Sequence, residues 1–317
     1  MAKQIRDPGI GEKFNARTKR LMNKDGTFNV RSKGIALKRI HPFQYLVNVS
    51  WAKFALILLL AFTTINLIYA TIYFSLGSAG LKTTIDMSPI SHFWQCVFFS
   101  LNTLTTVGFG NFCPSGYKAN IVAGLEAMTG LLGFAFATGL LYGRFSRPSS
   151  KIGYSENALI APYNDGSALM IRLVNLRNSI MTDVDVDITF TYEERIGNQY
   201  MRRFYQLPLE RNEVNYLPLT WTLVHPIDEN SPFYGKTHEE LKEIDSELMI
   251  NLKGHDEGFG EQVHSRTSYL MDDVIWGARY IPSFHVDDAG IVLLDFEKLS
   301  AYEKVNLDRE PVLLNLV

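Results

Sequence analysis

The sequence predicts a membrane-embedded helical part followed by an all-β part: two transmembrane helices with a re-entrant helix between them, then a β-sandwich of the immunoglobulin type. Two long apolar runs stand in the first half of the 317 residues, and a shorter apolar and aromatic run lies between them. The second half alternates polar with apolar residues over short stretches. Apolar runs of about twenty residues can cross a bilayer, whereas strict alternation is the pattern of a half-buried strand.

Two segments are long enough to span a membrane. The first covers residues 51–76 and has no charged side chain after Lys53, and the second covers residues 119–146 with Glu126 as its only charge before Arg144. Since a hydrocarbon core of about 30 Å requires roughly twenty apolar residues in a helix, we expect an outer helix and an inner helix here. The alternative is that both are buried core helices of a soluble protein.

Basic residues predict the orientation of the two spans. Twelve Lys and Arg side chains lie between Lys3 and Lys53 against three acids, while the loop between the spans has only Lys82 and Lys118. Because translocation disfavours positive charge, both termini are predicted to face the cytoplasm, in a multi-pass protein of the plasma or inner cell membrane. The large C-terminal part is then cytosolic.

A third apolar segment lies between the spans at residues 91–104. Its fourteen residues are too few to cross the bilayer, so it fits a re-entrant half-helix capped by Ser88 or Ser91. Irregular backbone after such a helix is tolerated at membrane depth only where protein or a water-filled cavity surrounds it, and a pore is one such place. We expect Glu126 of the second span to be buried beside this half-helix and satisfied there, since an unpaired charge in the membrane is costly.

Ahead of the first span, residues 41–50 mix apolar with polar side chains at helical spacing, behind a basic N-terminal arm at residues 1–40. This pattern predicts an interfacial helix that lies along the membrane surface. The alternative is a cytosolic extension of the first span.

After Pro148 the chain changes to short β-rich runs separated by turn residues. Residues 183–192 alternate polar side chains with five apolar ones, which is the period of a strand with one buried face. Similar runs recur at residues 168–176, 201–207, 219–224, 247–252, 268–270, 274–280 and 291–296. Their number and spacing predict an antiparallel sandwich over residues 148–300, followed by a C-terminal tail at residues 301–317.

Directly after the half-helix stands the sequence TLTTVGFG, which ends in Thr106, Val107, Gly108, Phe109 and Gly110. The two glycines can adopt backbone angles that are closed to other residues, so that successive carbonyl groups can point at one axis. The first four carbonyl oxygens of these five residues can then replace the hydration shell of a potassium ion, and the C-terminus of the half-helix adds a favourable dipole. The alternative to such a selectivity filter is an ordinary glycine turn in some other loop.

Composition argues against several other classes. The formal net charge of -2 gives no reason to expect a nucleic-acid partner, and two cysteines, Cys96 and Cys113, cannot build a disulfide framework or a common zinc site. The histidines of the C-terminal half, such as His225, stand in no recognised nucleophile or metal motif. We therefore expect neither an enzyme nor a cofactor, and only the permeant potassium ion as a ligand.

Around the filter, the sequence resembles the inward-rectifier potassium channels, most closely their prokaryotic branch, KirBac. The resemblance runs from about residue 41 to beyond residue 280. It rests on HPFQYLVNVSW, the filter, LLYGRFSRP, RLVNLRNSI, TLVHPIDENSPFY and SRTSYLMDDVIWG. It implies passive and selective potassium transport by a homotetramer, in which three identical subunits complete the pore and each cytosolic sandwich extends the conduction path.

The resemblance assigns roles to the inner helix. Phe134, Thr138 and Tyr142 lie four residues apart on one flank of a helix and would line the inner cavity, with Tyr142 at the bundle crossing that closes the pore. Gly130 and Gly139 occupy positions where this helix could bend. The alternatives are an interfacial anchor for Tyr142 and close helix packing for the two glycines.

A glycine-rich segment is similar to the family's cytosolic constriction loop. The residues of this loop are Gly254, His255, Glu257, Gly258 and Gly260. Glu257 with Arg266 matches a pair that braces the loop in the family. The alternative is a surface ion pair of little energetic weight.

Four basic residues resemble the family's contacts with anionic lipids. They are Arg144, Arg147, Lys151 and Arg177. A basic side chain near a negatively charged leaflet contributes about 1 kcal/mol, so the group predicts modulation by phosphoinositides or other anionic lipids. The alternative is that each is an ordinary solvated charge.

The sequence also departs from the family pattern. Gly133 and Lys253 stand where many eukaryotic relatives have acids, although Asp183 keeps one acidic position. Block by a polyamine requires negative rings, so we do not expect strong rectification, while Mg²⁺ and Ba²⁺ are further candidate blockers. Phe109 replaces the usual filter tyrosine and removes a hydroxyl group that could form a hydrogen bond behind the filter.

Two rival interpretations stay open at this point. A weakly selective cation channel would share the architecture but pass sodium as well as potassium. A ligand-sensing or scaffolding sandwich that is merely tethered by two helices would carry no ion flux.

Overall fold

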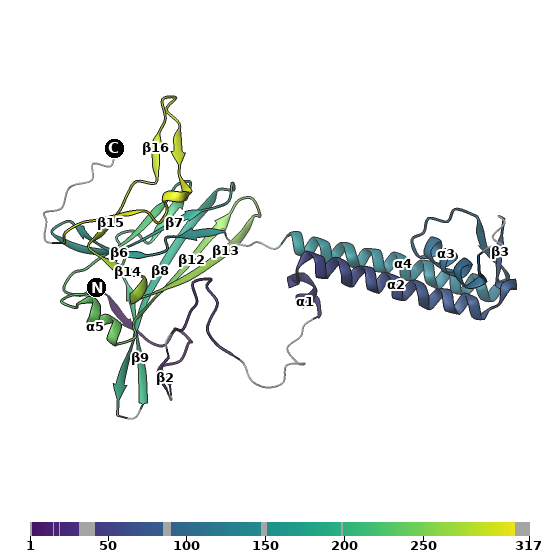
Figure 1. Cartoon of the computed structure of the whole chain (residues 1–317), viewed down its shortest axis with the longest axis horizontal. Coiled ribbons are helices and arrows are strands. Elements are labelled where there is room, and N and C mark those ends of the chain that lie inside the picture. Colours follow the sequence, from purple (N-terminus) through teal and green to yellow (C-terminus); the bar gives the residue numbers. More distant parts are fainter. Residues whose placement is uncertain are drawn as a thin grey trace. The chain divides into compact units, whose positions relative to one another are not determined.

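The computed structural model describes residues 2–14, 16–18, 20–31, 42–84, 90–146, 151–197 and 199–307. The chain divides into two compact units (Figure 1). The helical unit is Lys33–Arg147, and the β unit combines Met1–Ser32 with Pro148–Val317.

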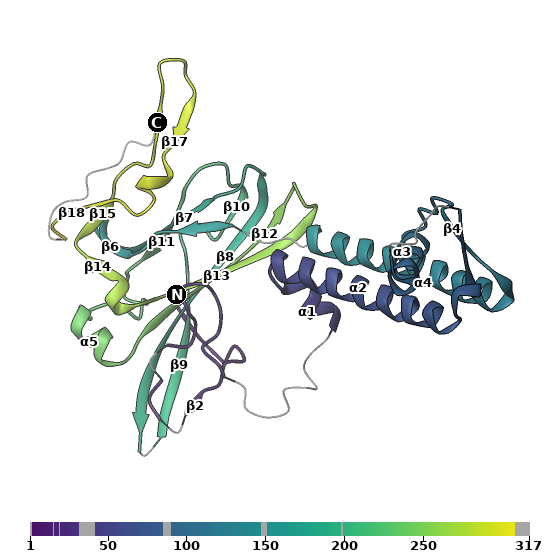
Figure 2. The same ribbon diagram turned by 45° about the vertical axis from the view of Figure 1, so that its right-hand side comes forward.

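The helical unit contains three long or medium helices, one short helix and a small hairpin. The helices are α1 (Pro42–Asn48), α2 (Trp51–Ser75), α3 (His92–Leu104) and α4 (Gly116–Phe145), and the hairpin pairs β3 (Leu81–Thr83) with β4 (Phe112–Pro114). The helices α2 and α4 run side by side, and α3 packs against both of them near the hairpin (Figure 1 and Figure 2).

Both α2 and α4 are long and apolar enough to cross a membrane. Their most apolar windows have mean hydropathies of 2.1 and 1.6, and only 11% and 6% of these windows are buried within the chain. The core helix of a soluble protein would be mostly buried, whereas these two helices leave their apolar side chains to lipid or to another protein surface. The predicted outer and inner helices are therefore confirmed.

The other predicted helices are also present. The half-helix expected at residues 91–104 agrees with α3, and the interfacial helix expected at residues 41–50 agrees with α1, although His41 lies outside the described residues. The inner helix α4 begins at Gly116, three residues before the predicted start. Its first turn contains the charged Lys118, which a search for apolar runs does not include.

The β unit is a sandwich of two sheets. The larger sheet has the order β1, β9, β8, β12, β13, with β10 paired to β8 and β2 to β9, and the smaller has the order β11, β7, β6, β14, with β5 paired to β7. The larger sheet comprises β1 (Lys3–Ile5), β2 (Lys13–Phe14), β8 (Met181–Ile196), β9 (Gln199–Leu207), β10 (Glu213–Tyr216), β12 (Glu247–Asp256) and β13 (Glu261–Leu270). The smaller sheet comprises β5 (Ile152–Tyr154), β6 (Ala158–Tyr163), β7 (Gly166–Asn175), β11 (Trp221–Pro226) and β14 (Val274–Trp276).

Four shorter strands and one short helix complete the β unit as described. The ribbons pair β15 (Ala278–Tyr280) with β18 (Tyr302–Lys304) and β16 (Phe284–Val286) with β17 (Val292–Leu294), and the helix is α5 (His238–Glu243). The predicted strand at residues 274–280 is divided into β14 and β15, because Gly277 between them has a φ of 64° that an extended strand does not allow.

Apolar side chains of both sheets form one core. Ile171 and Leu173 of β7 belong to the same buried cluster as Val186 and Ile188 of β8 and Ile250 of β12. The alternation predicted for residues 183–192 is therefore confirmed as the one-sided burial of a longer strand.

The N-terminal residues belong to this sandwich. Strands β1 and β2 both pair with β9, so the prediction of a separate arm at residues 1–40 is wrong for residues 3–14. The prediction of a tail from residue 301 is wrong as well, because β18 pairs with β15. Both pairings join residues that are far apart in sequence. Neither the N-terminal segment nor β18 has the alternating apolar pattern that predicts a strand.

A buried ionic cluster holds the N-terminal segment on the larger sheet. The side chain of Arg202 is 0% exposed and lies between the carboxylates of Glu193 and Glu247, with nitrogen to oxygen distances of 3.3 and 3.9 Å. Glu247 also accepts hydrogen bonds from the backbone N–H groups of Leu21 and Met22 at 2.8 and 3.0 Å. The three charged groups therefore pair with one another and also hold the backbone of the N-terminal segment at Thr18, Leu21 and Met22.

Candidate ion-conduction site

The predicted filter begins where α3 ends. The N–H groups of Val107 and Gly108 both donate to the carbonyl oxygen of Asn102, at 3.0 and 3.3 Å, and Thr106 N–H donates to Thr103 at 3.0 Å. The last carbonyls of a helix have no partner within the helix. Here the filter backbone supplies these partners and is thereby fixed to the last turn of α3.

The backbone of the filter alternates in the sign of φ. Thr106, Gly108 and Gly110 have φ values of 59°, 56° and 81°, whereas Val107 and Phe109 are not in the left-handed region. The glycine requirement at positions 108 and 110 agrees with the sequence analysis. The positive φ of Thr106 was not predicted, since a β-branched residue rarely adopts it, and such strain is typical of a functional segment.

The carbonyl oxygens of this segment are available for a ligand. The oxygens of Thr106, Val107, Gly108 and Phe109 accept no hydrogen bond from any residue that the structure describes. A Cβ added at Gly108 or Gly110 would meet no atom within 4 Å, so backbone conformation and not crowding favours glycine there. A buried or membrane-embedded carbonyl needs a partner, and a dehydrated cation can be that partner.

Behind the filter, a polar cluster joins the three long helices. Glu126 of α4 is fully buried and accepts hydrogen bonds from Tyr73 of α2, at 2.6 Å, and from the hydroxyl of Ser100 of α3. The expectation that Glu126 is buried and satisfied beside the half-helix is therefore confirmed. Cys96 is buried among apolar side chains, whereas Cys113 is exposed.

The proposed cavity residues share an uncovered flank of α4. Phe134 and Tyr142 are each 73% exposed, and Thr138 between them is exposed with its hydroxyl donating to the Phe134 carbonyl at 2.9 Å. The two proposed hinge glycines differ from each other. Gly130 packs against the backbone of Leu104 in α3, whereas a Cβ at Gly139 would meet nothing within 4 Å.

The predicted constriction loop is the turn between β12 and β13. Gly254 and His255 lie in β12, and Glu257, Gly258 and Gly260 lie in the turn. Within the described chain the predicted brace between Glu257 and Arg266 does not form. The strand register places Arg266 opposite Asn251, to which it donates a hydrogen bond of 3.1 Å, while Glu257 follows Asp256 at the far end of the hairpin.

A different residue braces this turn. Asp256 is buried, accepts a hydrogen bond from Gly258 N–H at 2.9 Å, and accepts another from the Ser179 hydroxyl at 3.1 Å. Aspartate with glycine two residues later is a common signature of such a turn, so the sequence contained the signal. Gly254 is closely packed, because a Cβ would lie 2.8 Å from the end of the Met181 side chain and 3.2 Å from the Val184 side chain.

Arg144, one of the predicted lipid contacts, binds the backbone at the end of α1. Its guanidinium donates to the carbonyl oxygens of Leu46, Val47 and Val49 at 2.6, 3.1 and 2.7 Å, and so caps the C-terminal end of α1. It also lies 4.5 Å from the centroid of the Trp51 ring. Arg144 therefore fixes α1 to the end of α4, where Phe43 and Val47 of α1 also pack against Gly143.

The other three predicted lipid contacts differ in their surroundings. Lys151 is exposed, and Arg177 lies over the ring of Phe259 at 4.7 Å in the β unit. Arg147 lies outside the described residues.

An aspartate on the solvent-facing side of the larger sheet forms an ion pair with a lysine. The ammonium group of Lys253 lies 3.6 Å from the carboxylate of Asp185, and Asp183 nearby is exposed with a φ of 49°. Lys253, at a position where the resemblance implied an acid in many eukaryotic relatives, therefore offsets part of the charge of Asp185.

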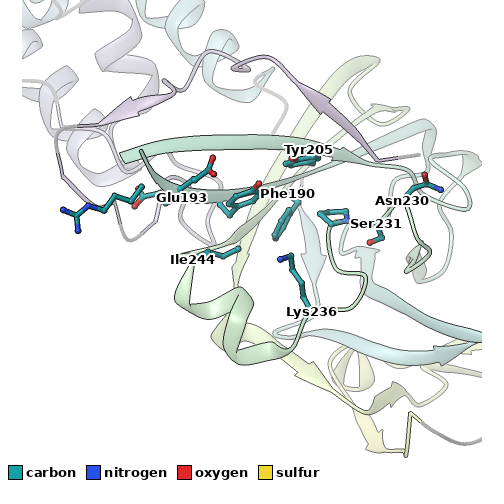
Figure 3. A pocket seen from close by; sticks show the side chains of 11 residues that line it. Phe190, Glu193, Tyr205, Asn230, Ser231, Lys236 and Ile244 are labelled. Carbon is teal, nitrogen blue, oxygen red and sulfur yellow. The ribbon is translucent and has the colours of Figure 1, made fainter. Parts of the chain in front are cut away.

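Figure 3 shows an open pocket of about 470 Å³ in the β unit. The rings of Tyr192 and Tyr205 stack on one side of it with centroids 5.9 Å apart, and Glu194, Arg195 and Lys236 also line it. Charges of both signs at its walls select for neither an anion nor a cation. The described residues contain no group of three or more His, Cys, Asp and Glu side chains placed to hold a metal ion.

A short helix between two apolar helices, followed by a segment whose carbonyl groups accept no hydrogen bond from a described residue, is typical of the pore domain of an ion channel subunit. Residues 50–147 match the family model described as ion channel, and residues 152–313 match the model of the inward rectifier potassium channel C-terminal domain. The chain belongs to the inward rectifier potassium channel family. It is accordingly a membrane protein that conducts potassium and not an enzyme, as the sequence predicted.

Individual relatives match along almost the whole chain. The inward rectifier potassium channel Kirbac3.1 of Paramagnetospirillum magnetotacticum is 34% identical over 292 residues, which are 91% of this chain and 97% of that protein. The ATP-sensitive inward rectifier potassium channels 10 and 8 of Homo sapiens are 26% and 25% identical. They cover 96% and 90% of this chain and 84% and 75% of their own lengths.

Proposed function

We propose that four identical copies of this chain surround one pore in the plasma or inner cell membrane and carry potassium passively, with both termini in the cytoplasm. The observation that supports this most directly is the row of carbonyl oxygens from Thr106 to Phe109, which no described residue uses. One chain can surround only one side of an ion, whereas four chains around an axis supply complete oxygen rings. Potassium ions at these oxygens are the only ligand that the mechanism requires, and no cofactor takes part.

The closed state is proposed to form at the inner helices. The uncovered flank with Phe134, Thr138 and Tyr142 is the part of α4 that four copies could bring to the axis, and rings of bulky Tyr142 side chains would expel water from a narrow passage. The turn between β12 and β13 is proposed as a second constriction in the cytosolic part of the path. Because Glu257 and Arg266 are distant within one chain, a brace between them would have to join neighbouring subunits.

Anionic lipids are proposed to modulate this gate. Lys151 is exposed and free to approach a negative leaflet, while Arg144 acts indirectly by fixing α1. We keep Arg147 and Arg177 as further lipid contacts. Ba²⁺ and Mg²⁺ are proposed blockers, and polyamine block is expected to be weak because Lys253 offsets the charge of Asp185.

A flux assay tests the proposal. Liposomes that contain the purified protein and are loaded with potassium should take up external rubidium, driven by the outward potassium gradient. Ba²⁺ should inhibit this uptake, and external sodium should inhibit it little. Gly108→Ala should abolish this uptake, because a φ of 56° strains alanine by about 1–2 kcal/mol and four copies of the strain occur in each pore. Gly77→Ala is the matched control, since Gly77 has a φ of 77°, equally open surroundings and a position outside the filter.

The rival interpretations predict different results. In a weakly selective cation channel, external sodium would inhibit rubidium uptake as strongly as external potassium does. A sensing module tethered by two helices would show no flux at all, and its properties would survive Gly108→Ala.

A further inference from the structure

The buried carboxyl group of Glu126 has no part in the proposed conduction path, yet it lies at the centre of the helical unit. Glu126 and Ser100 are 0% exposed, Tyr73 is 1% exposed and Asn66 is 5% exposed. A carboxyl group inside a membrane protein is costly unless its oxygens are hydrogen-bonded. A packing role alone could be filled by an apolar side chain, so the polar group calls for a different explanation.

The hydrogen bonds of Glu126 are divided between two helices. One carboxyl oxygen accepts from the Tyr73 hydroxyl of α2 at 2.6 Å, and the other accepts from the Ser100 hydroxyl of α3. The Ser100 oxygen in turn accepts from the Asn66 side-chain amide of α2 at 3.1 Å. Hydrogen bonds are directional, so this cluster fixes how α3 is rotated and how far it is inserted between α2 and α4.

The same surface of α4 touches α3 again one turn further along. Gly130, four residues after Glu126, packs on the backbone of Leu104, which lies four residues after Ser100. The two contacts are therefore one helical turn apart on both helices. Between them lies Asn102, whose carbonyl oxygen holds the N–H groups of Val107 and Gly108.

From this geometry we infer that Glu126 is a positioning residue for the selectivity filter, which acts through Ser100 and α3 and with Tyr73 as its second anchor. This inference rests on the proposed potassium conduction at the filter. Displacement of α3 by a few tenths of an ångström moves Asn102 and the filter backbone attached to it. Loss of the cluster is therefore expected to weaken discrimination between ions without preventing assembly.

Three single-site variants of the full chain test this inference. Tyr73→Phe removes one donor to Glu126, and Glu126→Gln replaces one carboxyl oxygen by a group that cannot accept. Tyr69→Phe is the matched control, because the Tyr69 hydroxyl bonds to Thr129 at 2.8 Å and so joins α2 to α4, whereas the ring that packs near α3 is kept in phenylalanine.

Two measurements are compared in reconstituted tetramers. The first is competition of potassium and sodium with rubidium uptake, where Tyr73→Phe and Glu126→Gln should lose about fivefold to tenfold in potassium preference, the effect of roughly one hydrogen bond. The second is hydrogen exchange at the amides of Val107 and Gly108, which should become faster by a similar factor. In Tyr69→Phe both quantities should stay within about twofold of the wild type.

The results separate this inference from the proposed function. If the wild type shows no potassium-selective flux, the conduction proposal fails, while the exchange rates at Val107 and Gly108 still decide whether Glu126 orders the segment. Unchanged exchange and unchanged selectivity in Glu126→Gln would overturn the inference. An equal effect of Tyr69→Phe would also overturn it, because any loosening of the helices would then suffice.

Discussion

Gly130 of α4 faces the backbone of Leu104 so closely that a Cβ at this glycine would overlap the Leu104 carbonyl oxygen and lie 2.9 Å from its carbonyl carbon. Gly139, nine residues further along the same helix, has no such neighbour. From the sequence, both glycines are candidate hinges, with close helix packing as the alternative. The surroundings favour packing for Gly130 and leave Gly139 as the position where α4 can bend without losing a contact.

We expect Gly130→Ala and Gly139→Ala to differ sharply. The first should reduce the yield of assembled protein and lower the unfolding temperature, because backbone of α3 and not a flexible side chain must move, at a cost of about 1–3 kcal/mol. The second should assemble normally. Size-exclusion profiles and thermal unfolding in detergent provide the comparison, and equal behaviour of the two variants would contradict the packing assignment.

The capping of α1 by Arg144 leads to a second prediction. Arg144→Lys keeps the positive charge but has one ammonium group in place of a fork that reaches three carbonyls. We expect a loss of about 2 kcal/mol in local stability and faster hydrogen exchange in α1. Lys53→Ala removes an exposed charge from the neighbouring helix α2 and should leave exchange in α1 unchanged.

The ionic cluster around Arg202 predicts how the N-terminal segment is held. Glu247→Gln removes a negative charge beside a guanidinium that is 0% exposed, and breaking such a buried arrangement typically costs about 3–5 kcal/mol. We expect fast exchange at the amides of Leu21 and Met22 and a lower unfolding temperature. Glu194→Gln, at a partly exposed pair with Arg203, is the control and should change stability by less than about 1 kcal/mol.

The pH dependence of the β unit should depend in part on His225. Its ring is buried, with Nδ1 2.7 Å from the Pro208 carbonyl and Nε2 2.9 Å from the Ser231 hydroxyl, so Nδ1 donates and Nε2 accepts in the neutral form. Burial lowers the pKa of His225 below its ordinary value of 6.5, although the bond to Pro208 opposes this. Below pH 6.5 the unfolded chain therefore binds a proton that the folded chain does not.

The stability due to His225 is accordingly full above pH 6.5 and is lost as the pH falls below it. The expected loss is about 1.4 kcal/mol per pH unit for as long as the folded ring stays neutral. Comparing unfolding at pH 7.5 and 5.5 for the wild type and His225→Asn isolates this contribution. His285→Asn, at an exposed position, should keep the pH dependence of the wild type.

The elements that the sequence predicted well are those with a local signal. The spans α2 and α4, the half-helix α3 and the glycines of the filter each follow from residue types within one segment. The burial of Glu126 was predictable because a charge in a span needs partners, but its partners Tyr73 and Ser100 were not. Tyr73 lies on α2 and Ser100 on α3, and no local sequence pattern predicts which turns of these helices face Glu126 of α4.

The failures have the same physical origin. The N-terminal strands and β18 contain few apolar residues, and they become strands because β9 of the larger sheet and the short β15, respectively, offer them backbone partners. The brace expected between Glu257 and Arg266 does not form within one chain, because the register of β12 with β13 separates the two residues, and a brace between neighbouring subunits stays a prediction. The positive φ of Thr106 runs against the preference of a β-branched residue, so only the surrounding structure can impose it.

The proposed gate provides the last prediction. Tyr142 is 73% exposed in the single chain, which fits either a pore-facing ring or an anchor at the membrane interface. Tyr142→Ala should raise basal rubidium flux at equal tetramer content, because four bulky rings would be removed from the narrowest part of the passage. Phe136→Ala removes a comparable ring that is 64% exposed but lies about 120° around the helix, so it should leave basal flux unchanged. If flux in Tyr142→Ala is unchanged or lower, then Tyr142 acts at the lipid interface and the closure of the pore must be sought elsewhere on α4.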